Sequence, residues 1–81
     1  MRPTKTDIKT VTYACKDGYF VDMQEIGDCV EFYLYHEDSG IKMHMEGFEK
    51  NTIYHEESII EYIDNSFDEC VERYNEFGYN E

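Results

Sequence analysis

Residues 58–77, SIIEYIDNSFDECVERYNEF, decide the fold of this chain. Apolar residues recur here every three or four positions, which is the spacing that places them on one side of an α-helix. These residues are Ile59, Ile60, Ile63, Phe67, Cys70, Val71, Tyr74 and Phe77. Ser58 with Glu61 matches a capping box, and Gly78 follows where a left-handed C-terminal cap is expected. We therefore predict one amphipathic helix over residues 58–77.

The opposite side of the predicted helix carries a row of carboxylates, which we call the acidic stripe. Its six members follow one another at steps of three or four: Glu57, Glu61, Asp64, Asp68, Glu72 and Glu76. Like charges at this spacing repel each other by about 0.2–0.5 kcal/mol per pair. The stripe therefore does not stabilise the helix, and it is the first candidate for a binding surface.

The first of two predicted β-hairpins joins residues 6–15 to residues 19–24. The Asp-Gly pair between them suggests a two-residue turn. A three-residue loop is preferred because it gathers the apolar side chains of both strands on one face. That register places Tyr13 opposite Val21 and puts Gly18 in the left-handed position of a G1 bulge.

The second predicted hairpin joins residues 29–36 to residues 41–48 through the loop 37–40. Apolar and polar side chains alternate along both strands, as in a sheet with one buried face. The expected cross-strand pairs are Leu34 with Met43, Phe32 with Met45, Tyr33 with His44, Tyr35 with Lys42 and Glu31 with Glu46. Residues 24–28 are expected to link the two hairpins.

A sheet with one apolar face and a helix with one apolar side each need a partner to cover them. We predict a single α+β domain over residues 1–81, in which a four-stranded antiparallel meander (6–48) packs on the long C-terminal helix. Residues 49–57 cross from the sheet to the helix, with Ile53 and Tyr54 as expected anchors on the core.

The chain is strongly acidic, with 19 acidic and seven basic residues and a net charge of −12. Residues 52–81 hold nine acidic residues and one basic residue, whereas residues 1–51 hold ten and six. This balance argues against direct binding to nucleic acid or to an anionic membrane, because both attract Lys and Arg. The chain also lacks an apolar run long enough for a membrane-spanning helix.

Location and cysteine chemistry are also predicted from the sequence. Residues 1–5 lack the apolar core of a signal peptide, so the expected location is the cytoplasm, which is that of the host cell if the chain is phage-encoded. Cys15, Cys29 and Cys70 lie far apart in the chain, and we expect reduced and mostly buried thiols.

Motifs of catalysis and metal binding are not found. The sequence has no glycine-rich phosphate loop, no nucleophile elbow and no zinc-binding helix motif. His36 and His44 are expected on opposite faces of the sheet, so they do not converge on a metal ion. We therefore predict a protein that is not an enzyme and has no cofactor and no metal site.

Tyr33, Tyr35 and His44, which we call the Tyr/His cluster, are expected together on the sheet face away from the helix. Tyrosine suits a half-exposed sheet surface, and it is also enriched where proteins contact each other. Both interpretations stay open at this point. Phe77 and Tyr79 are further candidate aromatic anchors for a partner.

In size, acidity and small α+β build, the whole chain resembles the small acidic phage-type inhibitor proteins that mimic nucleic acid. Anti-CRISPR proteins and inhibitors of uracil-DNA glycosylase belong to this class. The resemblance rests on physical character across the chain and not on a motif. It implies a non-enzymatic action, in which the protein occupies the nucleic-acid channel of its partner and blocks it.

These observations predict an interaction protein whose acidic stripe, extended by Glu49, Glu56 and Asp38, docks on a basic surface of a nucleic-acid-binding partner. One alternative is a regulatory module that binds a small ligand, or forms a homodimer, through the Tyr/His cluster. Another is an antitoxin or immunity protein that neutralises a basic nuclease.

Overall fold

A computed structural model describes residues 8–53 and 55–77 as one sheet and one helix. The strands are β1 (Ile8–Ala14), β2 (Tyr19–Ile26), β3 (Cys29–His36) and β4 (Met43–Glu49), and the helix is α1 (Glu56–Glu76). The strands are antiparallel neighbours in the order β1-β2-β3-β4. The predicted meander and the α+β class are confirmed.

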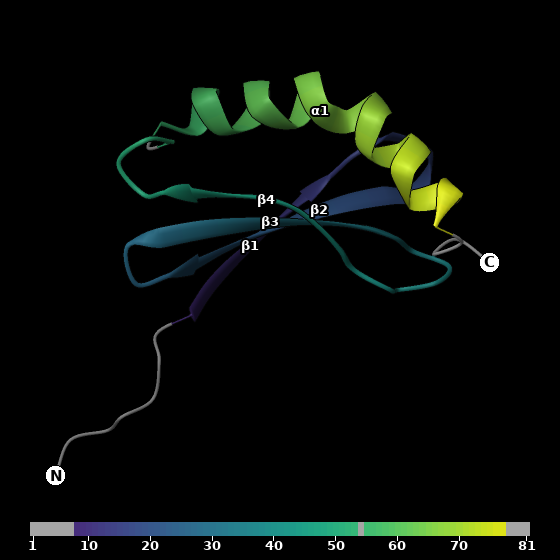
Figure 1. Cartoon of the computed structure of the whole chain (residues 1–81), viewed down its shortest axis with the longest axis horizontal. Helices are drawn as coiled ribbons and strands as arrows, with labels where there is room; N and C mark the ends of the chain where they lie inside the picture. Colours follow the sequence, from purple (N-terminus) through teal and green to yellow (C-terminus); the bar gives the residue numbers. More distant parts are fainter. Residues whose placement is uncertain (1–7, 54, 78–81) are drawn as a thin grey trace, which may run out of the picture.

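The helix α1 lies over one face of the sheet, so the molecule has two layers (Figure 1). Within the described residues, no other element covers the opposite face, which we call the open face. Alternation along each strand therefore divides the side chains between the core beneath α1 and this open face.

The first hairpin has the predicted register, in which Tyr13 pairs with Val21. Gly18 has a φ of +79°, as expected, and Asp17 also adopts a positive φ of +61°. A Cβ atom at position 18 would lie 2.9 Å from Nε2 of His36. Glycine is therefore needed both for the backbone conformation and for this close approach.

The connection between β2 and β3 is shorter than predicted. Ile26 pairs with Cys29, so Gly27 and Asp28 form the turn in place of the whole segment 24–28. Gly27 has a φ of +61°, which suits a two-residue turn between antiparallel strands. The short turn lengthens the pairing between β2 and β3.

Strands β3 and β4 pair in two registers that are separated by a β-bulge. Leu34 pairs with Met43, as predicted. Phe32 pairs with Glu46, so its predicted pairing with Met45 is wrong. The prediction assumed one unbroken alternation along β4.

Residue spacing along β4 explains the bulge. Three positions separate Met45 from Phe48, so a regular strand would turn one of the two away from the core. The extra residue lets both side chains pack against the core. It also pairs Glu31 with Gly47, so the predicted pair of Glu31 with Glu46 is wrong.

Helix α1 begins at Glu56, two residues earlier than predicted. The predicted capping box is wrong, because the N-cap residue is His55 and it makes no side-chain capping hydrogen bond. Glu56 and Glu57 occupy the first turn, where negative charge interacts favourably with the helix dipole. The C-cap is Phe77, and the predicted cap Gly78 lies outside the described residues.

The core lies between the sheet and α1. Its fully buried side chains are Val21, Val30, Phe32, Leu34 and Tyr74, and α1 also buries Ile59, Ile63, Phe67 and Cys70. The predicted apolar side of the helix is wrong at Ile60 and Phe77, which are 44% and 59% exposed. Ile60 borders a hollow beside β1, and Phe77 is the C-cap residue that follows the helix. Ile53 is buried as predicted, and Tyr54 lies outside the described residues.

Tyr74 connects α1 to the loop between β3 and β4. Its hydroxyl donates a hydrogen bond to the carbonyl oxygen of Ile41 at 2.5 Å. The hydroxyl oxygen of Tyr74 also lies 2.6 Å from Oγ of Ser39 and accepts a hydrogen bond from the backbone N–H of His36 at 3.3 Å. Because Ile41 is held in this way outside the sheet, β4 begins at Met43 and not at residue 41 as predicted.

Three aromatic rings pack together elsewhere in the core. The ring centroids of Phe32, Phe48 and Tyr62 lie 4.9–5.8 Å apart. Burial raises the pKa of Tyr62 to about 12, assisted by the Cys70 thiolate that forms at alkaline pH and by the carboxylate of Glu46. The fold therefore favours the neutral phenol in this position.

Replacing the buried tyrosine of α1 tests the connection to the loop. Tyr74→Phe keeps the ring and removes the hydroxyl, which leaves the Ile41 carbonyl without this donor. We expect the free energy of unfolding to fall by about 1–3 kcal/mol in urea denaturation. Tyr33→Phe, on the open face, is the control and should change it by less than about 0.5 kcal/mol. Equal effects of the two variants would contradict this role of Tyr74.

The fold should lose stability at alkaline pH. The pKa values are raised by burial for Tyr13, Cys15, Tyr62 and Cys70, and by the hydrogen bond to Asp22 for Lys42. Each group holds its proton more tightly in the folded chain, so unfolding releases protons. The resulting stability is complete below about pH 9 and is lost as the pH rises through the folded values, which reach about 12 for Tyr62.

Urea midpoints measured between about pH 9 and about pH 11 are therefore expected to fall steadily. The fall should be smaller in the variant Tyr62→Phe, which lacks the group with the largest raised pKa. A midpoint that stays constant or rises across this range contradicts the expected direction.

Candidate partner-binding surfaces

The acidic stripe lies on the outer side of α1, and all six of its side chains are exposed. Within residues 8–53 and 55–77, none of the six forms an ion pair. The ion pair on the helix joins Glu69 to Arg73 at 3.3 Å, beside the stripe. At 1.5 Å per residue, the stripe is a row of negative charge about 28 Å long, with neighbouring carboxylates about 5–6 Å apart.

The three residues predicted to extend the stripe, Glu49, Glu56 and Asp38, lie in three different parts of the structure. Glu56 continues the row at the start of α1. Glu49 ends β4, and Asp38 lies in the loop after β3, where its carboxylate is 3.7 Å from Nδ1 of His36. All three side chains are exposed, but only Glu56 lies on the helix.

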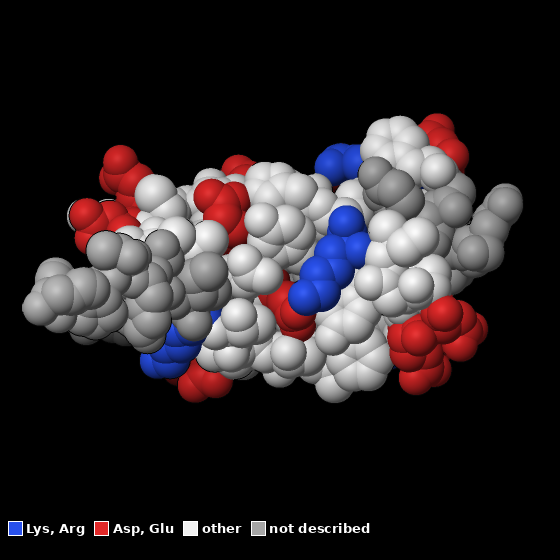
Figure 2. Space-filling model, turned by 90° about the horizontal axis from the view of Figure 1, so that it is seen from below, with Lys and Arg blue, Asp and Glu red and all other residues white. Residues whose placement is uncertain are grey.

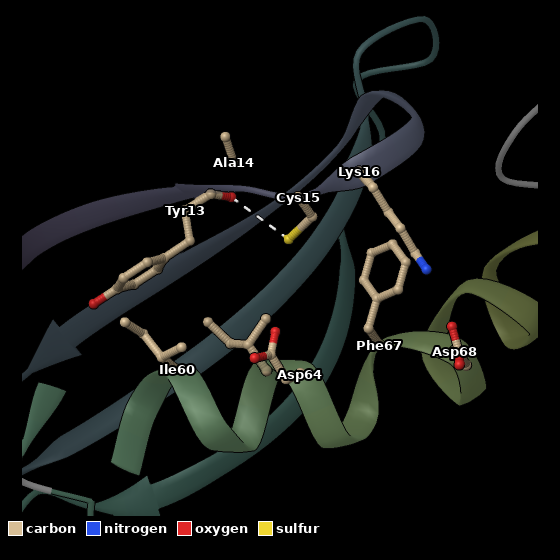
Figure 3. Close-up of a pocket in the computed structure, with 9 residues that line it drawn as sticks. Tyr13, Ala14, Cys15, Lys16, Ile60, Asp64, Phe67 and Asp68 are labelled. Atoms are coloured by element: carbon tan, nitrogen blue, oxygen red, sulfur yellow. Dashed lines mark hydrogen bonds between the residues drawn. The ribbon is translucent and has the colours of Figure 1, made fainter. Parts of the chain in front are cut away.

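A groove of about 540 Å³ runs between α1 and the edge strand β1, and we call it the β1–α1 groove (Figure 3). Its lining residues are Tyr13, Ala14, Cys15, Lys16, Ile60, Ile63, Asp64, Phe67 and Asp68. Figure 3 shows Tyr13 and Cys15 directed towards the helix and Ile60 directed towards the strand. Two members of the acidic stripe, Asp64 and Asp68, thus border a largely apolar hollow.

The polar groups inside the groove make defined contacts. Nζ of Lys16 lies 5.6 Å from the centre of the Phe67 ring. Sγ of Cys15 lies 3.8 Å from the carbonyl oxygen of Tyr13. Burial, together with the negative charge of Asp64, raises the pKa of the Cys15 thiol. The thiol is therefore protonated at neutral pH and is not an activated nucleophile.

The three cysteines differ in exposure. Cys70 is buried and Cys15 is half-buried, but Cys29 is exposed, so the prediction of mostly buried thiols is wrong for Cys29. Cys29 starts β3 directly after the two-residue turn, at an end of the sheet. There it borders a second hollow of about 500 Å³ with Asp28, Glu49, Lys50 and Asn51.

The Tyr/His cluster is brought together on the open face. Tyr33 pairs with His44 across β3 and β4, with ring centroids 5.3 Å apart. Tyr35 stacks on Phe20 of β2 with centroids 5.5 Å apart, and Nζ of Lys42 lies 5.5 Å from the Tyr35 ring. Figure 2 views this face and shows mainly uncharged surface around a central basic side chain.

Asp22, which sequence reasoning missed, lies in the middle of the open face. It is 4% exposed, although no element covers this side of the sheet within the described residues. Its carboxylate accepts a hydrogen bond from Oγ1 of Thr12 and pairs with Nζ of Lys42, both at 2.8 Å. A single carboxylate in the apolar run of residues 19–23 was the available signal.

The acidic stripe and the Tyr/His cluster lie on opposite sides of the molecule. The stripe is on the outer side of α1, whereas the cluster is on the face of the sheet away from α1. One flat partner surface therefore does not contact both. Phe77 follows the end of α1 and is exposed, and Tyr79 lies outside the described residues.

His36 and His44 lie on opposite faces of the sheet, as predicted. His36 packs towards the core with its ring centroid 4.7 Å from that of Tyr19. His44 lies on the open face, with Nε2 2.5 Å from a carboxylate oxygen of Glu31. Among the described residues, no group of three or more His, Cys, Asp or Glu side chains is arranged to hold a metal ion.

Comparisons with models of known protein families, with curated proteins and with solved structures find no match to this chain. In the part of the chain that the structure describes, no helix has the length and apolar character needed to cross a membrane.

The ion pair between exposed Lys42 and buried Asp22 can be tested by removing its cation. Lys42→Met leaves the Asp22 carboxylate buried beside Thr12 without its ammonium partner, so we expect the free energy of unfolding to fall by about 1–3 kcal/mol. The control is Lys50→Met, because Lys50 pairs at 3.3 Å with the more exposed Glu25. It should cost less than about 1 kcal/mol. Equal losses in thermal or urea unfolding would contradict a special role of Asp22.

Proposed function

We propose that this protein acts by binding, through the acidic stripe of α1, to a basic surface of a nucleic-acid-binding protein. The observation that carries the proposal is the row of six exposed carboxylates without an ion-pair partner in the described part of the chain. A basic surface supplies the missing counter-charges. Long-range electrostatic attraction would also steer the partner protein to the stripe and raise the rate of association.

The spacing of the stripe supports a nucleic-acid-binding partner. Carboxylates about 5–6 Å apart along a helix approach the spacing of successive phosphates along a nucleic-acid strand. A groove that binds a phosphate backbone with Lys and Arg can accept such a row in its place. The protein is then a non-enzymatic inhibitor that competes with DNA or RNA, in the manner of an anti-CRISPR protein. An antitoxin for a basic nuclease uses the same chemistry with a different partner.

A second candidate function is self-association or the binding of a small ligand through the open face. It is favoured by the aromatic rings of Phe20, Tyr33 and Tyr35, which form a largely uncharged surface on an otherwise acidic protein. Aromatic residues are enriched at contact surfaces. This function does not use the acidic stripe, so the two candidates can be separated by mutation.

Charge reversal tests the first candidate. The variant Glu61→Lys, Asp64→Lys, Asp68→Lys places three positive charges in the middle of the stripe. Affinity capture from a cell lysate should lose its nucleic-acid-binding partner, because attraction is replaced by repulsion. The wild-type protein should retain that partner at low salt and release it on addition of DNA or of high salt.

The matched control is Asp28→Lys, Glu37→Lys, Glu46→Lys, which changes the net charge equally through exposed residues outside α1. It should keep the partner, and both variants should keep the circular dichroism spectrum of the wild type. Capture that survives reversal of the stripe but is lost in Tyr33→Ser, Tyr35→Ser would replace the first candidate with the second.

A further inference from the structure

We propose that the β1–α1 groove is an anchor site for an apolar side chain of the partner, carried on a short amphipathic segment rich in Lys and Arg. This inference rests on the proposed function and names the kind of segment that the stripe would bind. The partner's apolar residue would enter the groove, and its flanking cations would meet the neighbouring carboxylates.

The groove exists because one helix is too narrow for this sheet. Four strands about 4.8 Å apart form a surface wider than a helix with a diameter of about 10–12 Å. In the order β1-β2-β3-β4, α1 packs most directly on β3, and the edge strand β1 lies two strands away from it. Val11, Tyr13 and Cys15 consequently pack against the core while remaining only partly buried.

The groove presents apolar surface to solvent. Ile60 is 44% exposed and is directed towards β1, where the side chain of Tyr13 faces it (Figure 3). Phe67 and Ile63 line the same hollow. A volume of about 540 Å³ is within the range of sites that take up apolar groups of ligands. An apolar side chain placed here would remove surface of both molecules from water.

Charge complementarity indicates a basic segment as the occupant. Asp64 and Asp68 belong both to the groove and to the acidic stripe, so the apolar hollow opens directly onto the row of carboxylates. The carboxylate of Glu56 raises the pKa of Tyr13, after the larger effect of burial, which places a further negative charge near the strand side. Lys16 already rests on the Phe67 ring, so a cation is accommodated beside this apolar surface.

A second copy of the chain fits this site less well. Each copy carries a net charge of −12 and the same acidic border, so two copies facing each other at the groove would repel. A segment with apolar residues on one side and Lys or Arg on the other satisfies both features. Interfaces of this kind place an apolar anchor in a pocket and polar contacts around it.

The test uses the full chain and two synthetic peptides of equal length and equal lysine content. One peptide carries leucines at helical spacing, and in the other serine replaces each leucine. Fluorescence anisotropy should show that the leucine peptide binds the wild-type protein about tenfold or more tightly than the serine peptide. Both should bind more weakly at high salt, because the lysines act through the stripe.

Two isoleucine variants test whether the preference for the leucine peptide arises in the β1–α1 groove. Ile60→Ser alters the groove, whereas Ile41→Ser removes an isoleucine of similar exposure, 49%, from the loop after β3. Ile60→Ser should lose most of the preference for the leucine peptide while its affinity for the serine peptide stays unchanged. Ile41→Ser should keep the preference. If Ile41→Ser loses as much of it as Ile60→Ser, the groove is not the anchor site.

Cys15 provides a second measurement, because its thiol lies in the groove while Cys70 is buried. In a Cys29→Ser background, the leucine peptide should slow the reaction of Cys15 with a thiol reagent, and the serine peptide should not. Equal protection by both peptides, or by neither, would overturn the anchor site.

The failure of this inference can be distinguished from the failure of the proposed function. If both peptides bind equally and in a salt-dependent manner, the stripe binds cations and the anchor site is wrong. If neither peptide binds at low salt, the proposed function fails and the inference fails with it. If the protein self-associates in sedimentation and Ile60→Ser abolishes this, the occupant is a second copy and the inference is overturned.

Discussion

The packing of α1 on one face of the sheet is the interaction on which the rest of this structure depends. A helix with a row of like charges is a poor helix in isolation, and tertiary packing of its apolar side is what makes it stable. Ile59, Ile63, Phe67 and Tyr74 supply that packing. The same packing leaves the carboxylates no role in the core, so the outer side of α1 is available for binding.

Much of the fold could be predicted because alternation and helical periodicity are local signals. Both hairpins, the class and the length of the helix to within two residues follow from them. The bulge near Met45 could not be derived from alternation alone. It arises because Met45 and Phe48, three positions apart, both pack against the same core. The helix start was misplaced because a serine in a plausible cap position is only a local preference, and His55 precedes the first turn.

The candidate sites also differ in whether a local sequence pattern could predict them. The acidic stripe follows from the helical spacing of acidic residues within one segment, and all six of its side chains are exposed. The β1–α1 groove and the burial of Asp22 depend on which strands the helix covers and on where Lys42 lies after the loop. Both features depend on how segments that are distant in the sequence pack together. Sequence periodicity therefore identified the charged surface and missed the hollow beside it.

The bulge in β4 has a consequence beyond the packing of Phe48. Strand β4 is an edge of the sheet, and an unbroken edge is a template on which another chain can add as a strand. A bulge interrupts the regular row of backbone donors and acceptors and increases the local twist. Glu46 and Glu49 are exposed along the same strand, and charged side chains of this kind disfavour intermolecular strand addition. One inserted residue thus lets Met45 and Phe48 both pack against the core, and we expect it also to disfavour aggregation through this edge.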